Sequence, residues 1–540
     1  MQTSLRRSPP RTACFTSSTR SCCLRKSKAG VVRNYSAWSV SRALRVVALL
    51  GMIAPLSGCT ASGVSGRPAD AGVDAGMQEP VEEGTYFVRD DDGRVLILRG
   101  MNIMSSSKGH PERLPDLEEQ DVERYAQKWG FNVVRYLIFW DAIEPSPEQY
   151  DTAYFDKTEE RLDWFADHGV YVILDMHQDV YAERFCCDGA PLWAIEDDDL
   201  PFDQNPVWSL NYFAPAVQAA FDNFFDYPGE HSRLQDHFAG AWAAVVERFK
   251  DHPAVLGYDI LNEPSPGSAY HARDITITPD DGEAAEFDRT LFTEFYERMI
   301  AAIREVDQDG WIFYEPRVAA PANGQRSFIL ELDDPRDGDA RIVYSPHLYS
   351  VQFEFNQAYN PATDATLEHW EANRNIETAE QKAPLLLGEW GFDPDWPNAD
   401  LFMRELLDMS DRMMLGWTYW SYDPGGWGIW ERNEEGEVVE RDNANALVRP
   451  YPQRVAGIPR SFSYNPDART FELAFDPSPS ATLPTEIYVP ATRHYRDGWS
   501  LTGCDEVDGC SSTWNADTEM LEIFTLNRTA RVDLRIAPSP

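Results

Sequence analysis

The sequence is short of basic residues. It contains 48 Lys and Arg residues against 89 Asp and Glu residues, and its formal net charge is −41. Ten of the basic residues and none of the acidic ones lie in residues 1–59, so the rest of the chain has 38 basic residues against 89 acidic ones. A surface that negative repels phosphate backbones, which excludes nucleic acid as a natural partner. The charge does not identify a substrate, because solubility or a salty habitat accounts for it equally well.

Cysteine is also scarce and lacks metal-binding spacing. Of the eight cysteines, only Cys186, Cys187, Cys504 and Cys510 lie beyond Cys59. None of them forms a CxxC motif or a His/Cys cluster, so no structural metal is indicated. We also expect no cofactor. Exported proteins retain disulfides, and Cys504 can close a short acidic loop with Cys510. The state of the adjacent pair stays open, because a bridge between neighbouring cysteines is strained.

No apolar run of the sequence predicts a membrane-spanning helix. The run at residues 46–55 is too short to span a bilayer and follows a basic segment. It precedes Leu-Ser-Gly-Cys at residues 56–59, which resembles a bacterial lipobox. We therefore expect residues 1–59 to be a signal sequence and Cys59 to be lipidated in a secreted or cell-surface lipoprotein, with an ordinary signal peptide as the alternative. Residues 60–83 lack apolar periodicity, which indicates a flexible linker.

Short apolar segments alternate with amphipathic ones in residues 84–450. The predicted strands are residues 95–103, 132–140, 170–177, 255–263, 311–316, 341–349, 384–390 and 415–422. The predicted helices are residues 116–129, 155–168, 237–250, 287–306, 366–381 and 400–413. Eight strands alternating with helices are typical of an α/β fold of the (β/α)8 TIM-barrel type. A doubly wound open sheet shares the alternation, but it usually has fewer strands, and no Gly-rich phosphate loop follows the first strand here.

The pattern changes in residues 451–540. Short apolar runs separated by Pro, Gly, Asn and Asp predict a small C-terminal β-sandwich of six to eight strands. These runs lie at residues 461–464, 470–475, 486–489, 499–501, 520–526 and 530–536. We expect the two-domain protein to be a monomer.

Two glutamates lie at positions where barrels of this kind place their catalytic residues. Active sites of such barrels lie at the carboxyl ends of the strands. Glu263 ends the fourth predicted strand and Glu389 lies at the end of the seventh. Retaining glycoside hydrolysis requires one carboxylate as nucleophile and a second as acid/base, about 5–5.5 Å apart. Either glutamate alone could be a loop residue in a salt bridge. The two together, each after an apolar strand, indicate a glycosidase.

The motifs around these residues resemble the catalytic motifs of glycoside hydrolase family 5, the cellulase-like barrels. The resemblance rests on Asn262-Glu263-Pro264 and on Gly-Glu-Trp-Gly at residues 388–391. Further matches fall in order on other strands, at Arg135, His177, residues 346–349 and residues 417–421. The resemblance implies Glu389 as the nucleophile, Glu263 as the acid/base, and Arg135 as support for the nucleophile.

Within that family, several stretches resemble the endoglycoceramidase group. They are residues 100–102, 108–109, 175–181, 188–191 and 252–258. The resemblance implies hydrolysis of the β-glycosidic bond between oligosaccharide and ceramide of a glycolipid, met at a membrane surface through the substrate or the lipid anchor. It implies sugar-contacting roles for Lys108, His177, Asp179, Asn262, Tyr349 and Trp420, and supporting roles for Arg135 and His347.

Other functions remain open at this point. A steryl glucosidase or a β-glucanase of the same family would keep the same catalytic pair. A non-catalytic glycolipid-binding lipoprotein is disfavoured, because such a protein is expected to lose one of the two carboxylates. Burial is expected to raise the pKa of Glu263 so that it keeps its proton. The apolar segments 193–225 and 351–355, which includes Phe353, are either walls of a lipid channel or loops that pack a small core of their own.

Overall fold

A computed structural model describes residues 86–271, 282–504 and 509–539. The predicted signal sequence, Cys59 and the whole predicted linker lie outside these residues. Within the described part, no helix combines the length and apolar character needed to cross a membrane.

The central element is a sheet of eight parallel strands, which confirms the predicted barrel. Among the described residues the strands follow the order β7-β6-β5-β4-β3-β2-β9-β8, and two isolated parallel bridges, Tyr344 to Leu385 and Leu348 to Trp390, connect the two ends. The strands are β2 (Arg99–Ile103), β3 (Val133–Ile138), β4 (Tyr171–Met176), β5 (Val255–Asp259), β6 (Trp311–Tyr314), β7 (Ile342–Tyr344), β8 (Leu386–Trp390) and β9 (Gly416–Tyr419). Their side chains are almost all buried, as expected for strands covered on both faces.

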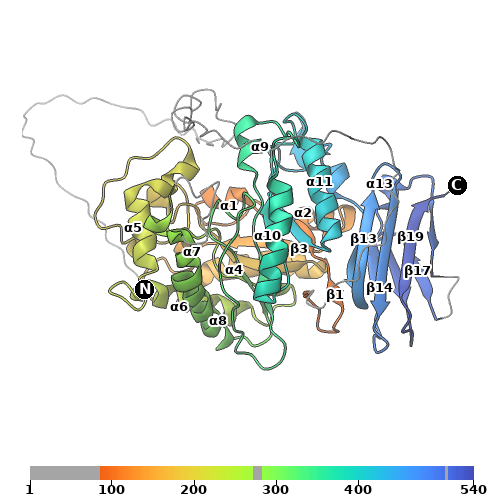
Figure 1. Cartoon of the computed structure of the whole chain (residues 1–540), viewed down its shortest axis with the longest axis horizontal. Coiled ribbons are helices and arrows are strands. Elements are labelled where there is room, and N and C mark those ends of the chain that lie inside the picture. The colour runs from red at the N-terminus through yellow and green to blue at the C-terminus, as the bar shows by residue number, and fades with distance from the viewer. Residues whose placement is uncertain (1–85, 272–281, 505–508, 540) are drawn as a thin grey trace, which may run out of the picture. The chain divides into compact units, whose positions relative to one another are not determined.

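Amphipathic helices lie around this sheet (Figure 1). The longer ones are α4 (Thr152–Asp167), α5 (Pro215–Phe224), α6 (Arg233–Phe249), α8 (Thr293–Arg304), α10 (Thr366–Gln381) and α11 (Ala399–Arg412). The Asp151 carboxylate caps α4 by accepting hydrogen bonds from the backbone of Ala153 and Tyr154. The bounds of α10 are those predicted, whereas α5, which lies within the apolar segment 193–225, was not predicted.

Two antiparallel sheets form the C-terminal β-sandwich and confirm that prediction. One has the order β1-β12-β15-β18-β17 and the other β13-β14-β19-β16. The strands are β1 (Val95–Leu96), β12 (Tyr451–Val455), β13 (Gly457–Asn465), β14 (Thr470–Pro477), β15 (Thr485–Tyr488), β16 (Trp499–Thr502), β17 (Ser511–Asn515), β18 (Met520–Phe524) and β19 (Val532–Pro538). Strands β12 and β17 were missed, because Pro452 interrupts one and the other is polar and half exposed.

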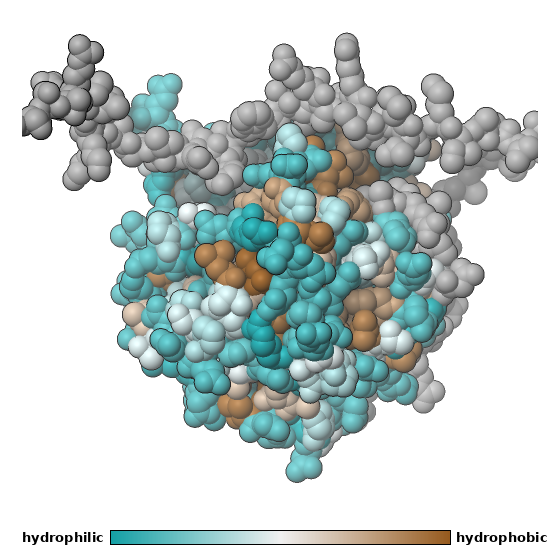
Figure 2. Space-filling model, turned by 90° about the vertical axis from the view of Figure 1, so that its left-hand side faces the viewer, coloured by the Kyte–Doolittle hydropathy of each residue, from teal (hydrophilic) through white to brown (hydrophobic). Residues whose placement is uncertain are grey.

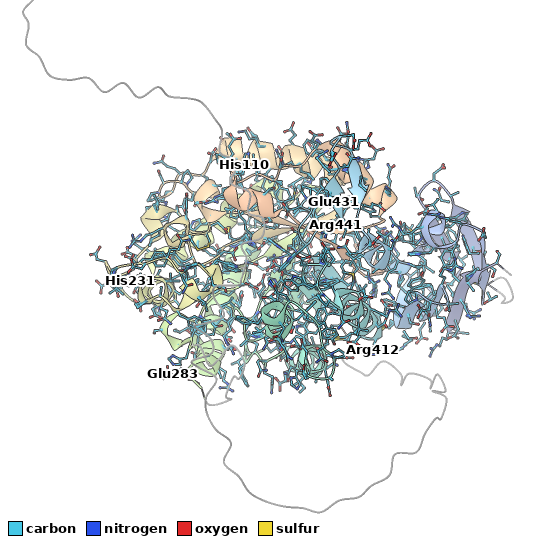
Figure 3. The ribbon with its side chains drawn as sticks, turned by 90° about the horizontal axis from the view of Figure 1, so that it is seen from above. His110, His231, Glu283, Arg412, Glu431 and Arg441 are labelled. Carbon is cyan, nitrogen blue, oxygen red and sulfur yellow. A yellow bond between two sulfur atoms is a disulfide. The ribbon has the colours of Figure 1, made fainter. Side chains whose placement is uncertain are left out.

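The first predicted strand, residues 95–103, is two strands that belong to different sheets. Val95 pairs with Val455 of β12, and the barrel strand begins only at Arg99. A buried ion pair lies at this junction, where the Arg99 guanidinium is 2.6 Å from Asp411 at the end of α11. Arg449 contacts the same carboxylate at 3.0 Å. The sandwich is therefore joined to the amino-terminal end of the barrel strands, away from their carboxyl ends. Figure 3 shows His231, between α5 and α6, on the side of the barrel opposite the C-terminal sheets.

Candidate active site

The two predicted glutamates meet at the carboxyl end of the barrel. Glu263 follows β5, and Glu389 lies within β8, with 7 % of its surface exposed. One carboxylate oxygen of each, together with a ring nitrogen of His347, lies within 4.8 Å of the others. This separation matches a retaining pair, since inverting enzymes hold their carboxyl groups about 6.5–9.5 Å apart to admit a water molecule.

Arg135, from β3, lies at the centre of the site and is fully buried. Its guanidinium lies 2.8 Å from Asp175, 2.8 Å from Asp259, 2.6 Å from Glu315 and 3.3 Å from Glu389. Four carboxylates around one guanidinium raise the pKa of Arg135 well above its ordinary value, although burial alone would lower it. The contact with Glu389 is the longest of the four. Arg135 therefore holds Asp175, Asp259 and Glu315 at least as closely as it holds the predicted nucleophile.

His347 bridges Glu263 and a carboxylate that the sequence did not single out. Its Nδ1 is 2.8 Å from Glu263, and its Nε2 is 3.2 Å from Glu315. Burial alone would lower the pKa of His347, but the carboxylates of Glu315, Glu389 and Glu263 raise it well above the usual value. Burial raises the pKa of Glu315 to about 7.

The expected rise in the pKa of Glu263 is wrong for this arrangement. Burial does act in that direction, but the hydrogen bond and charge of His347, followed by the charges of Lys108 and Arg135, bring the pKa of Glu263 below its usual value. Glu263 is therefore not an isolated carboxyl, because its protonation is tied to that of His347, to which it is hydrogen-bonded, and of Glu315 beside that ring.

The backbone of Glu263 is also fixed from two sides. Its φ of +39° lies in the left-handed region, which a non-glycine residue adopts only when its surroundings impose it. Glu315 accepts the hydrogen bond of the Glu263 amide at 2.8 Å. The Gln178 side-chain amide donates to the carbonyls of Asn262 and Glu263 at 2.7 and 3.0 Å. These contacts orient the Glu263 carboxyl toward Glu389.

A second polar group lies beside the carboxylate pair. The Lys108 ammonium is 2.6 Å from Asp179 and 4.2 Å from the centre of the Trp420 ring. Trp420 stacks on His177 with the ring centres 5.8 Å apart and 14° between the planes. The structure therefore brings four of the predicted sugar-contacting residues together. Burial opposes the charge of Lys108, but Asp179 and its neighbours raise the pKa of that ammonium.

His177 is held as a neutral hydrogen-bond acceptor. Its Nδ1 lies 2.7 Å from Asp175, and burial lowers the pKa of His177 well below the ordinary value. Donation from Nδ1 to Asp175 leaves Nε2 as the acceptor. Among the described residues, no hydrogen-bond partner reaches the buried Nε2, whose closest acidic neighbour is Asp179 at 4.0 Å. Nε2 can therefore accept a hydroxyl hydrogen bond from a ligand.

The remaining predicted residues lie in the same site. Tyr349 donates its hydroxyl hydrogen bond to Glu389 at 2.7 Å. The Asn262 side-chain oxygen accepts from Arg135 at 3.0 Å, and its amide donates to the Gln178 carbonyl at 2.9 Å. The Asn262 amide keeps one further N–H for a ligand, since it carries two.

Sequence reasoning missed several residues of this site. Glu315 is the last polar residue of the fifth predicted strand, a position that marks barrel active sites. Gln178, Asn102 and Asp188 were seen only as parts of motifs. Asn102 accepts a hydrogen bond from Arg135 at 3.1 Å and donates to the Gly388 and Thr418 carbonyls at 3.3 and 3.2 Å. A role that consists of holding another side chain leaves no distinct pattern in a single sequence.

Two of the clusters of acidic and histidine side chains that could hold a cation already face a basic side chain. Three groups bring suitable donor atoms within 4.8 Å of one another among the described residues. One of them surrounds Arg135, and another includes Asp179, which is paired with Lys108. A basic side chain supplies the positive charge in both places, which makes each a poor metal site.

The apolar segments mostly pack a core of their own. Phe353 is 2 % exposed and packs on Phe392, Trp396 and Phe402 around α9 (Val351–Asn356), so it is not a channel wall. In the other segment, the side chains of Tyr212, Phe221, Phe224 and Phe225 are buried. The large apolar side chains that remain exposed in the two segments, or directly before one of them, are Leu192, Trp208, Leu210 and Phe355. On the face that carries α5–α7, apolar side chains gather in separate patches within a hydrophilic surface (Figure 2).

Comparison with known proteins agrees with this geometry. Residues 90–426 match the family model described as cellulase (glycosyl hydrolase family 5), and residues 449–535 match the glycoside hydrolase family 5 C-terminal domain. The chain belongs to glycoside hydrolase family 5. It is a glycosidase with the two-domain organisation of that family.

Similar proteins within the family are endoglycoceramidases. Endoglycoceramidase I of Rhodococcus hoagii is 30 % identical over 437 residues, which are 79 % of this chain and 82 % of the relative. The endoglycoceramidase of Hydra vulgaris is 26 % identical over 78 % of this chain and 82 % of its own length. The structure of endo-glycoceramidase II from a Rhodococcus species in complex with ganglioside GM3 is 34 % identical, with a TM-score of 0.76 over 84 % of this chain and 100 % of that one. The same enzyme has also been solved as a lactosyl-enzyme intermediate, at 35 % identity.

Proposed function

We propose that this protein is a retaining endo-glycosidase that hydrolyses the β-glycosidic bond between the oligosaccharide and the ceramide of glycosphingolipids. The observation that carries the proposal is the approach of the Glu263 and Glu389 carboxylate oxygens to within 4.8 Å at the carboxyl end of the barrel. The similarity to endoglycoceramidases, one of them solved with GM3, supports the choice of glycolipid.

In the proposed reaction Glu389 attacks the anomeric carbon and forms a glycosyl ester. Arg135 and Tyr349 hold its two oxygens at 3.3 and 2.7 Å, which aims the carboxylate and balances its charge. Glu263 passes a proton from its hydrogen-bonded group with His347 to the departing ceramide oxygen. It then takes a proton from the water molecule that hydrolyses the ester, and the anomeric configuration is retained.

The sugar next to the scissile bond is proposed to lie between Trp420 and the polar group beside it. Lys108 and Asp179 bind its hydroxyls, and Nε2 of His177 accepts one more hydrogen bond. The free N–H of Asn262 is directed to the 2-hydroxyl, a contact that strengthens as positive charge develops on the ring. Support comes from the buried, unpartnered Nε2 and from the ammonium held 4.2 Å from the Trp420 ring centre.

Product analysis tests the function. Incubation with a lactosyl ceramide or a ganglioside is expected to release intact oligosaccharide and free ceramide, both identified by mass spectrometry. The proton NMR spectrum of the first product is expected to show the β-anomer. Glu389→Gln is the inactive control. Release of monosaccharide only would reject the endo mode, and activity confined to cellulose, mannan or a steryl glucoside would identify a different glycosidase of the family.

We also propose that the chain is exported and anchored by acylation of Cys59, where it meets glycolipids at a membrane surface as a monomer. The proposal rests on the basic amino-terminal segment, the apolar run and the lipobox-like residues 56–59. Labelled palmitate is expected to be incorporated into the wild-type chain and not into Cys59→Ala. If Cys59→Ala stays at the membrane, acylation of Cys59 is not the anchor.

A further inference from the structure

A disulfide between neighbouring residues lies in the loop that follows β4. Cys186 and Cys187 are bonded, with a sequence separation of one, and both side chains are half buried. Cys186 has a φ of +110°, a left-handed conformation that is unfavourable for a residue with a β-carbon. Ring closure between the two residues restrains the backbone at this position.

One residue separates this disulfide from the sugar-contacting group. Asp188 directly follows Cys187, and its carboxylate accepts the amide hydrogen bond of Asp179 at 3.1 Å. The Asp179 and Asp188 backbones also exchange two hydrogen bonds of 3.3 Å. Asp179 in turn holds the Lys108 ammonium at 2.6 Å. The position of the Lys108–Asp179 pair therefore depends on the backbone next to Cys187.

The other side of the disulfide contacts the segment that carries exposed apolar residues. The Asn211 side-chain amide donates to the sulfur of Cys186 at 3.7 Å. Asn211 belongs to η6 (Trp208–Phe213), and the hydroxyl of its neighbour Tyr212 accepts from the Val180 amide at 3.1 Å. The disulfide is thus linked, through Asn211 and its neighbour Tyr212, to Val180 near the start of the loop.

A bridge between neighbours contributes almost nothing to the stability of the whole fold. Disulfides stabilise by restricting the unfolded chain, and the effect grows with the length of the closed loop. A separation of one closes the shortest possible loop, whereas Cys504 and Cys510 are six residues apart in the sandwich. The consequence of the Cys186–Cys187 bond is therefore local, in the loop that positions Asp188 and Asp179.

We propose that the Cys186–Cys187 disulfide is a redox-sensitive positioning element of the sugar site, whose reduction weakens substrate binding. In the reduction, a dithiol transfers two electrons and two protons to the disulfide, which becomes two thiols while the reductant becomes a disulfide. Cys186 then leaves its left-handed conformation, and the Asp179–Asp188 hydrogen bonds open. The kinetic part of this inference rests on the proposed function, because it is measured as glycolipid hydrolysis.

Kinetics of the full chain in the oxidised and dithiothreitol-treated states test the inference. Reduction is expected to raise KM about tenfold and to change kcat by less than about threefold, since the Glu263–Glu389 pair is held by other contacts. Reoxidation restores KM. The Cys186→Ser/Cys187→Ser variant is expected to have the high KM with or without reductant.

Removal of the second disulfide gives the matched control. Cys504→Ser/Cys510→Ser lacks the sandwich bridge, so its KM is expected to respond to reductant as the wild-type KM does. A wild-type KM that does not change when mass spectrometry shows both bonds reduced would overturn the inference. So would a KM that responds to reductant in the Cys186→Ser/Cys187→Ser variant.

Hydrogen exchange provides a measurement that needs no activity. Reduction is expected to raise the exchange of the Asp179 and Asp188 amides at least about tenfold, because both are hydrogen-bonded in the oxidised loop. Unchanged exchange in the reduced chain contradicts the proposal whatever the substrate is. If the oxidised chain releases no oligosaccharide but this exchange rises, the proposed function fails and the positioning role stands.

Discussion

Each end of the barrel buries an arginine, but the two arginines differ in the number of carboxylates around them. At the carboxyl end, Arg135 is surrounded by four carboxylates, Glu389 among them. At the other end, Arg99 has one carboxylate partner, Asp411, which Arg449 shares. Burial lowers the pKa of Arg99, whereas the surrounding carboxylates raise that of Arg135.

The difference separates a reactive site from a structural one. An excess of buried carboxylates forces some of them to share protons, and groups that share protons can exchange them with a substrate. At the other end, the guanidinium of Arg99 lies among the Trp417, Tyr451 and Phe462 rings, 5.6, 5.1 and 5.3 Å from their centres. Aromatic rings take the place of further carboxylates there, and the ion pairs of Asp411 with Arg99 and Arg449 join the sandwich to the barrel.

The largest expected effect is on Glu263, the proposed acid/base, at the carboxyl end of the barrel. Glu263→Gln keeps the shape but removes the proton donor, so hydrolysis of a glycosyl ceramide is expected to fall about 10²–10⁴-fold in kcat/KM. The first step with a dinitrophenyl glycoside is expected to change much less, because that leaving group needs no proton. Burst kinetics with both substrates measure the difference. Glu371→Gln, which removes a carboxylate that pairs with Arg412 on α11, is the control. Equal losses on both substrates would assign Glu263 another role.

The next effect belongs to the opposite end. Asp411→Ala leaves the buried Arg99 guanidinium without its carboxylate and leaves Arg449 only the longer contact with Asp408, at 3.7 Å. It also removes an acceptor for the Tyr464 amide, so a loss of about 3–5 kcal/mol of stability is expected. The kcat and KM of the folded fraction should stay within about twofold, since the site lies at the other end. Thermal unfolding and assays at low temperature measure both. Asp467→Ala, which removes an exposed pair with Arg404, is expected to cost under about 1 kcal/mol. A collapse of kcat in Asp411→Ala would show that the two ends are coupled.

A smaller effect distinguishes positioning from catalysis within the site. Glu315→Gln weakens the support of the Glu263 amide and of His347, and kcat is expected to fall about 10–100-fold. The pKa of Glu315 is about 7, so below that pH the wild-type carboxyl is itself protonated and resembles glutamine. The defect should therefore be larger at pH 8 than at pH 5, which paired pH–rate profiles measure. A defect independent of pH would contradict the proton-sharing group.

Glu315 also illustrates how much of the site can be predicted from the sequence. Strand periodicity placed the strands in the right order but ran past the carboxyl ends of β5 and β7, which end at Asp259 and Tyr344 instead of residues 263 and 349. The motifs led to Glu263 and Glu389, which the structure brings within 4.8 Å. The lowered pKa of Glu263 was not predictable, because it depends on a histidine 84 residues away that touches both Glu263 and Glu315. A network of this kind arises from tertiary packing of several strands, which local pattern does not encode.

The fold shows the same limit at other positions. Alternation of strands and helices predicted the barrel, because the alternation remains recognisable even where the ends of single strands are misplaced. It could not divide residues 95–103 between two sheets, since both halves are fully buried and follow each other without a turn signal. It also could not decide which aromatic side chains of residues 193–225 face outward. Trp208 is 48 % exposed and Phe224 is 3 % exposed, although both stand in apolar surroundings in the sequence.

The smallest expected effect comes from Glu354, which adds one more negative charge near Glu263. Burial, with repulsion from Glu263, raises the pKa of Glu354 on α9 to about 7. The repulsion is mutual, so the ionised Glu354 disfavours ionisation of Glu263. Glu354→Gln removes that charge and is expected to move the basic limb of the kcat/KM profile to lower pH by a few tenths of a unit. Glu368→Gln on exposed α10 surface is the matched control. A shift to higher pH would mean that Glu354 stabilises the ionised acid/base, which contradicts a carboxylate excess at this end of the barrel.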